Sequence, residues 1–123
     1  MRRHAASALS IAAAITATGC GNASRHYQLA PTRTCLNERG FRTQVENNWV
    51  VKPSQGSLLV TFGRGIVGLE FGSSGREANG IRYAMLRAGG KKWPVDARRN
   101  IACVWDRKSK PHVAAVLDCL RPR

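Results

Sequence analysis

Two histidines follow residue 20, and histidine is the side chain that most often moves protons in enzymes. His26 lies in a polar stretch, whereas His112 stands near the start of a helical pattern, six residues after Asp106. Asp106 could orient the His112 ring, but no serine lies in a nucleophile-elbow pattern. We therefore predict no catalytic residue. The alternative is a small secreted enzyme or inhibitor with a site near His112 and a central hairpin.

A glycine motif in the middle of the chain has the spacing of a dinucleotide-binding loop. Residues 63–68 read Gly-Arg-Gly-Ile-Val-Gly, which matches GxGxxG. In that role the motif must open a helix, so that the pyrophosphate meets the helix N-terminus. Here Leu69-Glu70-Phe71 continues a strand pattern instead. The glycines therefore indicate a turn and close packing, and we predict no cofactor.

Positive and aromatic side chains gather between residues 91 and 99. Positive charge beside an amphipathic ring suits a polyanion, such as a lipid headgroup layer. The alternative is a solvated loop whose tryptophan packs back on the core. We name the predicted polyanion-binding residues the basic surface, which consists of Lys91, Lys92, Trp93, Arg98 and Arg99.

The first 20 residues have the parts of a bacterial export signal. Arg2-Arg3 are positive, residues 5–17 form a short alanine-rich apolar run, and small residues precede Cys20. The run is shorter than the roughly 20 apolar residues of a transmembrane helix. Ala17-Thr18-Gly19-Cys20 resembles the lipobox of bacterial lipoproteins, which usually has leucine where this chain has Ala17.

The lipobox resemblance implies a signal peptide over residues 1–19 and acylation of Cys20 with palmitate-type chains. It places the protein on the extracytoplasmic face of the cell membrane, held there by its lipid. Residues 20–31 are polar and patternless, and we expect them to form the tether. The alternative is a secretory signal that leaves Cys20 an ordinary thiol.

With Cys20 lipidated, three cysteines remain for an oxidising compartment. Cys35 and Cys119 lie near the two ends of the domain, in its first and last predicted helices, and a bridge between them closes a loop of about 84 residues. The chain-entropy model values such a loop at about 4 kcal/mol. We predict this disulfide, with Cys103 buried as a small hydrophobic side chain.

Zinc is not predicted, because the chain has no Cys-x2-Cys pair. The cysteine pattern, with Cys35 and Cys119 on either side of a central hairpin, resembles small lipoproteins of unknown function from high-GC, actinobacterial-type bacteria.

The chain is strongly basic, with 20 Lys and Arg against 7 Asp and Glu and a formal charge of +13. Removing Arg2 and Arg3 with the signal leaves 18 against 7, or +11. In an exported protein the available polyanions are anionic lipids and envelope polymers, so we expect these as partners rather than nucleic acid. The excess of arginine also fits GC-rich coding. The sequence identifies no protein partner.

Residues 57–71 give the clearest structural pattern, that of a β-hairpin. With a turn at Arg64-Gly65, Phe62 pairs with Val67, and the alternation places the large apolar residues of both strands on one face. Leu59 and Glu70 lie on the other face. A slip of one residue would scatter the apolar residues over both faces.

The other segments predict helices and strands around this hairpin. We expect helices over residues 31–39, 74–88 and 109–120, the second opened by a capping box of Ser74 and Glu77. Strands are expected at 41–46 and 100–105. Together, these helices, strands and the hairpin predict a single α+β domain over residues 32–123, with a small antiparallel or mixed sheet and helices packed on one face. We therefore expect a non-enzymatic binding or structural module of the cell envelope.

Overall fold

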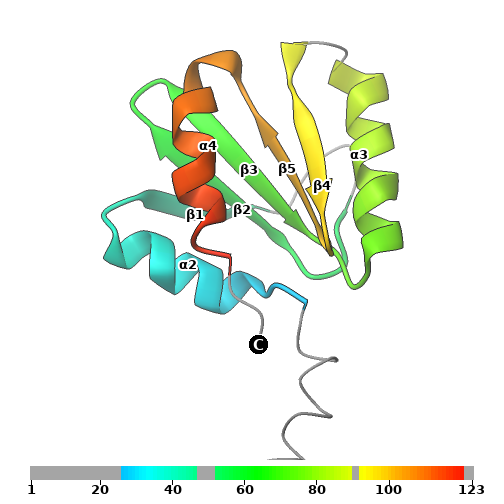
Figure 1. Cartoon of the computed structure of the whole chain (residues 1–123), viewed down its shortest axis with the longest axis horizontal. Helices are drawn as coiled ribbons and strands as arrows, with labels where there is room; N and C mark the ends of the chain where they lie inside the picture. Colours follow the sequence, from blue (N-terminus) through cyan, green and yellow to red (C-terminus); the bar gives the residue numbers. More distant parts are fainter. Residues whose placement is uncertain (1–25, 47–51, 90–91, 121–123) are drawn as a thin grey trace, which may run out of the picture.

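The fold is a five-stranded antiparallel sheet with helices packed against it (Figure 1). The computed structural model describes residues 26–46, 52–89 and 92–120. The strand order in the sheet is β1-β2-β3-β5-β4. The predicted α+β class is confirmed. In chain order the elements are α2 (Leu29–Glu38), β1 (Arg42–Glu46), β2 (Ser57–Phe62), β3 (Gly65–Phe71), α3 (Gly75–Gly89), β4 (Val95–Arg98), β5 (Ile101–Trp105), the 3-10 turn Arg107–Ser109 and α4 (Lys110–Leu117).

One face of the sheet carries the main core. Side chains alternate along a strand, so Leu58 and Val60 of β2 point to the same face as Val67, Leu69 and Phe71 of β3. All five are fully or almost fully buried. Helices α2 and α4 cover this face, and α4 crosses in front of β3 in Figure 1. Leu36 of α2 and Val116 of α4 are buried in this core, together with Cys119 and Leu120 from the segment after α4.

The hairpin turn lies one residue earlier than predicted, at Gly63-Arg64. Phe62 pairs with Gly65 and Val60 with Val67, so the register differs from the predicted one by two residues. Gly63 has a φ of 53°, and glycine accepts this conformation at the first turn position more easily than Arg64 would. Because a two-residue shift keeps every side chain on its face, the predicted division into two faces is still correct.

The third helix, α3, lies on the opposite face of the sheet from α2 and α4. It packs over β4 and β5 with Ala78 and Ile81 buried. As predicted, the Ser74 hydroxyl accepts a hydrogen bond from the Glu77 amide, at 3.1 Å. Strand β4 was missed in the sequence. It is only four residues long and lies at the sheet edge, so Asp96 and Arg98 alternate outward and hide its pattern.

The folded region begins earlier than the predicted boundary at residue 32. Helix α2 starts at Leu29, and Tyr27 is joined to the turn before β5, where the Asn100 side chain accepts a hydrogen bond from the Tyr27 amide at 2.7 Å. The buried Thr32 hydroxyl donates to the Gln28 carbonyl at 2.7 Å. Residues 27–31, which were predicted to be part of the tether, therefore belong to the folded domain. The predicted signal peptide and Cys20 lie outside the described residues.

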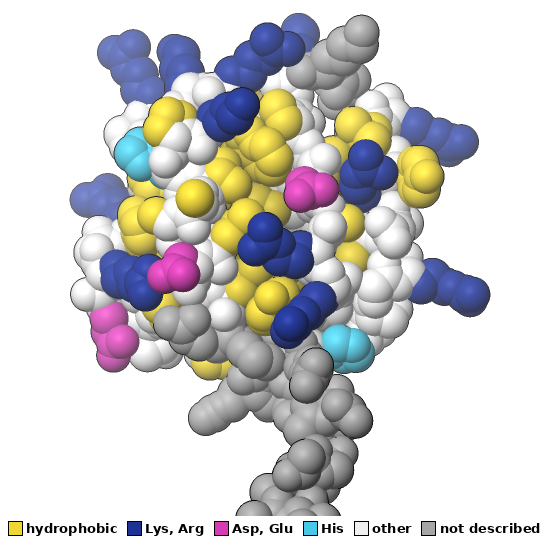
Figure 2. Space-filling view, in the orientation of Figure 1, with side chains coloured by type: hydrophobic (Ala, Val, Ile, Leu, Met, Phe, Trp, Pro, Cys, Tyr) yellow, Lys and Arg dark blue, Asp and Glu magenta, His cyan; other side chains and the backbone are white. Residues whose placement is uncertain are grey.

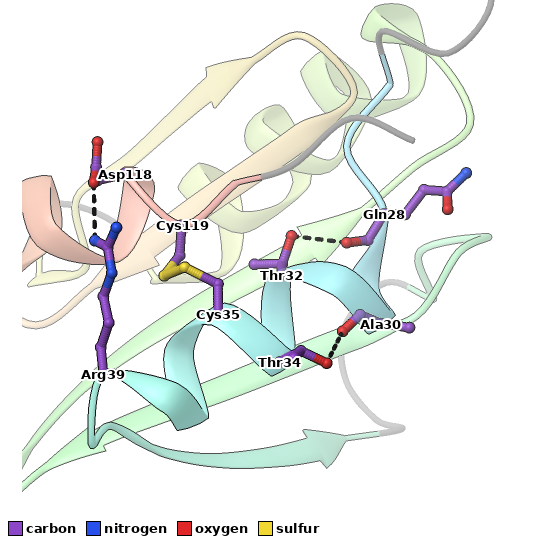
Figure 3. Close-up of a disulfide and its surroundings, with 8 residues drawn as sticks. All are labelled: Gln28, Ala30, Thr32, Thr34, Cys35, Arg39, Asp118 and Cys119. Atoms are coloured by element: carbon purple, nitrogen blue, oxygen red, sulfur yellow. Dashed lines mark hydrogen bonds and ion pairs between the residues drawn. A yellow bond between two sulfur atoms is a disulfide. The ribbon is translucent and has the colours of Figure 1, made fainter.

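The predicted disulfide between Cys35 and Cys119 is confirmed (Figure 3). It joins α2 to the segment after α4, with a Cα–Cα distance of 5.5 Å. Arg39 and Asp118 form an ion pair beside it, at 2.8 Å. Cys103 is a buried free thiol on β5, and burial raises its pKa to about 12. It acts as an apolar side chain, as predicted.

Candidate functional site

An apolar pocket lies on the sheet face that carries α3. The helix packs mainly over β4 and β5, and among the described elements it has few or no contacts with β1 and β2. The pocket between them has a volume of about 260 Å³. Its described walls include Leu59 and Ser57 from β2, Ile66, Gly68 and Glu70 from β3, Val104 from β5, Met85, Ala88 and Gly89 from α3, and also Glu46 and Trp93.

Gly68 forms the bottom of the pocket and has no side chain that would fill it. It lies between Leu59 and Val104 on the neighbouring strands. A Cβ atom at this position would lie 3.0 Å from Val104 Cγ1 and 3.4 Å from Glu70 Oε2. Glycine weakens a strand interior and often marks a place where another group approaches closely. Here the missing side chain is part of the pocket volume.

Glu70 is the buried acid of the pocket, with 4% of its surface exposed. It faces Ser57 across the hairpin, and the Ser57 hydroxyl donates a hydrogen bond to its Oε1 at 2.5 Å. Burial raises the pKa of Glu70 and outweighs the opposing effect of this hydrogen bond, while the nearby Glu46 carboxylate raises it further. The carboxyl is thus held where its charge is poorly solvated.

The pocket is acidic on a basic molecule. The described residues that line it include two glutamates, Glu46 and Glu70, and no lysine, arginine or histidine. On the opposite, α4-bearing side of the molecule, Figure 2 shows Lys and Arg side chains both around the margin and near the centre of the view. The described lining of the pocket is therefore opposite in charge to the molecule as a whole, whose formal charge is +13.

The described part of the basic surface is divided between the two ends of β4. Lys92 lies near Arg107 and Lys108, whereas Arg98 lies beside α4. The four residues of the strand span about 13 Å between them. Arg99, with a φ of 51°, stacks over the Tyr27 ring at 5.1 Å.

Trp93 belongs to the pocket as well as to the predicted basic surface. It is 37% exposed, and its side chain packs beside Gly89 at the end of α3. This is the arrangement in which the tryptophan folds back onto the domain. Lys91 lies outside the described residues.

His112 lies on the face of the sheet opposite the pocket. Its ring stacks on Phe62, with centroids 4.4 Å apart and planes at 9°. Asp106, predicted as its orienting partner, accepts a hydrogen bond from the Ile66 amide at 3.0 Å. The nearby Ser109 is fully buried, so a substrate could not reach its hydroxyl. The hairpin and His112 are in contact, but this contact is an aromatic stack and not a cleft.

Within the described ranges, no three His, Cys, Asp or Glu side chains are grouped so that they could hold a metal ion. Of the helices in those ranges, none is both long and apolar enough to cross a membrane.

Apart from Trp93, the residues that line this pocket were not predicted as site residues from the sequence. The sequence pattern placed Leu59 and Glu70 on one face, which is correct, but gave Glu70 no role. The available signal was an acidic residue inside Gly65–Phe71, a strand otherwise made of apolar residues and glycine. An acidic side chain in such a strand is either exposed at the edge of the sheet or buried with a hydrogen-bond partner. Because β3 pairs with both β2 and β5, it is a central strand, and Glu70 is buried.

No family model matches the chain, and no curated protein or solved structure matches it. The fold and the pocket are therefore the basis for any functional conclusion.

Proposed function

We propose that this protein is an exported, lipid-anchored binding protein of the cell envelope, which holds an apolar ligand in the α3 pocket without transforming it. The observation that carries the proposal is the apolar pocket of about 260 Å³ with the buried Glu70 in its wall. Pockets that bind small molecules are typically apolar with few fixed polar groups.

The disulfide supports the proposed location. Cysteine pairs form and persist in oxidising compartments and are rare in the cytosol. Cys35 and Cys119 form such a pair, with Cα atoms 5.5 Å apart. Export followed by acylation of Cys20 accounts for this pair and for the lipobox-like residues before Cys20.

The composition of the pocket favours binding over catalysis. Apart from Glu46, Glu70 and Ser57, the described lining residues have apolar side chains or are glycine, with the single Trp93 indole. General acid–base catalysis of hydrolysis usually needs a second ionisable group or an oxyanion site beside the first. Glu46 is a second carboxylate, but the described lining residues include no lysine, arginine or histidine that could stabilise a developing anion.

The location is tested by the intact mass of the mature protein purified from bacterial membranes. We expect a polypeptide that begins at Cys20 and carries a diacylglyceryl group. Cleavage at another residue, with Cys20 unmodified, would remove the lipid anchor from the proposal.

The pocket is tested with a neutral apolar probe, 2-phenylethanol, by NMR titration of the purified protein. We expect shifts at the amides of Leu59, Gly68 and Met85, which line the pocket. The variant Ala88→Phe places a ring into the pocket from an exposed position of α3, so it should abolish these shifts without unfolding the domain. Shifts that persist in this variant would place the probe elsewhere.

A further inference from the structure

We propose that the α3 pocket selects ligands with an apolar body and a cationic ammonium group, which pairs with the Glu70 carboxylate. This inference rests on the proposed binding function and adds the class of ligand. Three features of the pocket support it: its size, the orientation of the Glu70 carboxylate, and the charge of its walls.

The size of the pocket sets the apolar part of the ligand. A cavity of about 150 Å³ in another protein accepts a benzene ring. The volume here, about 260 Å³, holds one aromatic ring or a short branched chain and leaves room for a small polar group. Leu59, Ile66 and Met85 supply the apolar walls that would contact it.

The Glu70 side chain has one oxygen engaged and the other directed over the floor of the pocket. Ser57 donates to Oε1, whereas Oε2 lies next to the space above Gly68. Among the described residues, none donates a hydrogen bond to Oε2. Oε2 is not one of the fully buried side-chain atoms without a partner, so it keeps some access from the pocket, where a donor group of a ligand can reach it. A donor at this oxygen would replace the water contacts that a ligand displaces. The Ser57 hydrogen bond holds the carboxyl in this orientation.

The charge of the walls decides between ligand types. Glu46 adds a second negative group, and the described lining residues supply no positive one. An ammonium group would meet complementary charge in a poorly solvated site, where ion pairs are strong. A carboxylate of the same shape would face two like charges. A neutral alcohol would gain the apolar contacts and a weaker hydrogen bond.

Binding of three probes of similar shape tests this order in the purified protein: 2-phenylethylamine, 2-phenylethanol and 3-phenylpropanoate. At pH 7.5, by NMR titration, we expect the amine to bind at least tenfold more tightly than the alcohol and the carboxylate to bind most weakly. The variant Glu70→Gln keeps an acceptor for Ser57 and removes the charge. It should lower amine affinity at least tenfold and leave alcohol affinity within twofold of the parent value.

Two further variants serve as controls. Glu46→Gln removes the carboxylate that is not placed over Gly68 and should weaken amine binding only about two- to threefold. Ala88→Phe should abolish the binding of both the amine and the alcohol. Thermal unfolding of each variant checks that the domain remains folded.

The outcomes separate this inference from the function on which it rests. If the alcohol and the amine bind equally well and Glu70→Gln changes neither, the pocket binds ligands but the cation preference is refuted. If neither probe produces shifts at the pocket amides, the pocket is not a ligand site and both proposals fail. If amine binding survives Ala88→Phe, the cation binds elsewhere and the inference is overturned.

Discussion

Asn100 joins three parts of the chain through its side chain. It is 1% exposed, its Oδ1 accepts from the Tyr27 amide, and its Nδ2 donates to the carbonyls of Tyr27 and Gly72 at 2.9 and 2.7 Å. All of its hydrogen-bonding groups except one lone pair are thus used. A side chain that replaces the donor with an acceptor would face two carbonyl oxygens.

We therefore predict that Asn100→Asp lowers the free energy of unfolding by about 3 kcal/mol or more, since it buries a charge against carbonyl groups. The matched control is Asn79→Asp at an exposed position early in α3, expected within about 0.5 kcal/mol of the parent. Urea unfolding followed by circular dichroism measures both. Equal losses in the two variants would contradict the role of Asn100.

Glu77 makes the stability of the domain sensitive to acid. Burial opposes its ionisation, but the amides and hydroxyls of Ser54 and Ser73 all donate to its carboxylate and lower its pKa from 4.5 to about 2. A pKa lower in the folded state stabilises the fold above the unfolded value. This stabilisation is complete above about pH 4.5 and is lost as the pH falls towards 2.

The variant Glu77→Gln should be less stable than the parent by about 1–3 kcal/mol at pH 7, because charged hydrogen bonds are lost. The difference should shrink steadily between pH 4.5 and 2. Chemical unfolding at a series of pH values measures it, with Glu38→Gln, at an exposed position of α2, as the control. A difference that stays constant with pH would mean that the hydrogen bonds do not depend on the charge.

At the scale of the elements, the disulfide compensates for short helices. Helices α2 and α4 have 10 and 8 residues, below the roughly 12–15 at which an isolated helix becomes marginally stable. They are held on the sheet by packing and by the Cys35–Cys119 bridge, which joins α2 to the segment directly after α4. The bridge closes most of the folded chain into one loop.

Replacing Cys35 and Cys119 together with alanine should lower the free energy of unfolding by about 2–4 kcal/mol, mainly through the unfolded state. The control is Cys103→Ala, which leaves the bridge intact and removes one buried sulfur. Urea unfolding of the two variants compares them. A double variant as stable as the parent would contradict the stabilising role of the bridge.

Local patterns predicted most elements of this fold. The glycine at residue 40, with a φ of 87°, ends α2 as expected, and the alternation in β2 and β3 sorts their side chains correctly. The pattern could not fix the hairpin register, because registers two residues apart give the same faces. That choice depends on the backbone conformation of Gly63. Strand β4 was missed because an edge strand has little apolar surface to show.

Sequence patterns could not predict the pocket, for a different physical reason. A pocket is a place where packing is incomplete, and it depends on how far α3 extends across the sheet. The residues that form it, such as Met85 and Leu59, look like ordinary core residues in the sequence. Glu70 stands out only when both neighbours of β3 are known.

At the scale of the whole molecule, the basic charge is distributed rather than focused. The ends of β4 separate Lys92 from Arg98, and other exposed basic residues lie elsewhere, such as Arg64 at the hairpin turn. A spread charge attracts an anionic surface through the total field and not through one contact. Such attraction weakens with salt and depends on the number of charges more than on their position.

We therefore predict that the four cations of the basic surface contribute no more to polyanion binding than four other exposed cations do. Changing them together to glutamine should lower the salt concentration at which the protein elutes from heparin. An equal number of changes at other exposed sites should lower it by about the same amount, because both remove four charges from the formal total of +13. The control set is Arg42, Lys52, Arg64 and Arg76.

Retention on vesicles with anionic lipids should give the same ranking as heparin, because the attraction in both cases depends on net charge. Binding that falls much further in the basic-surface variant than in the control would instead show a defined polyanion site around β4. Retention unchanged in both variants would mean that the basic charge plays no part in binding these partners. The comparison separates a surface used for recognition from a net charge that only favours contact with the envelope.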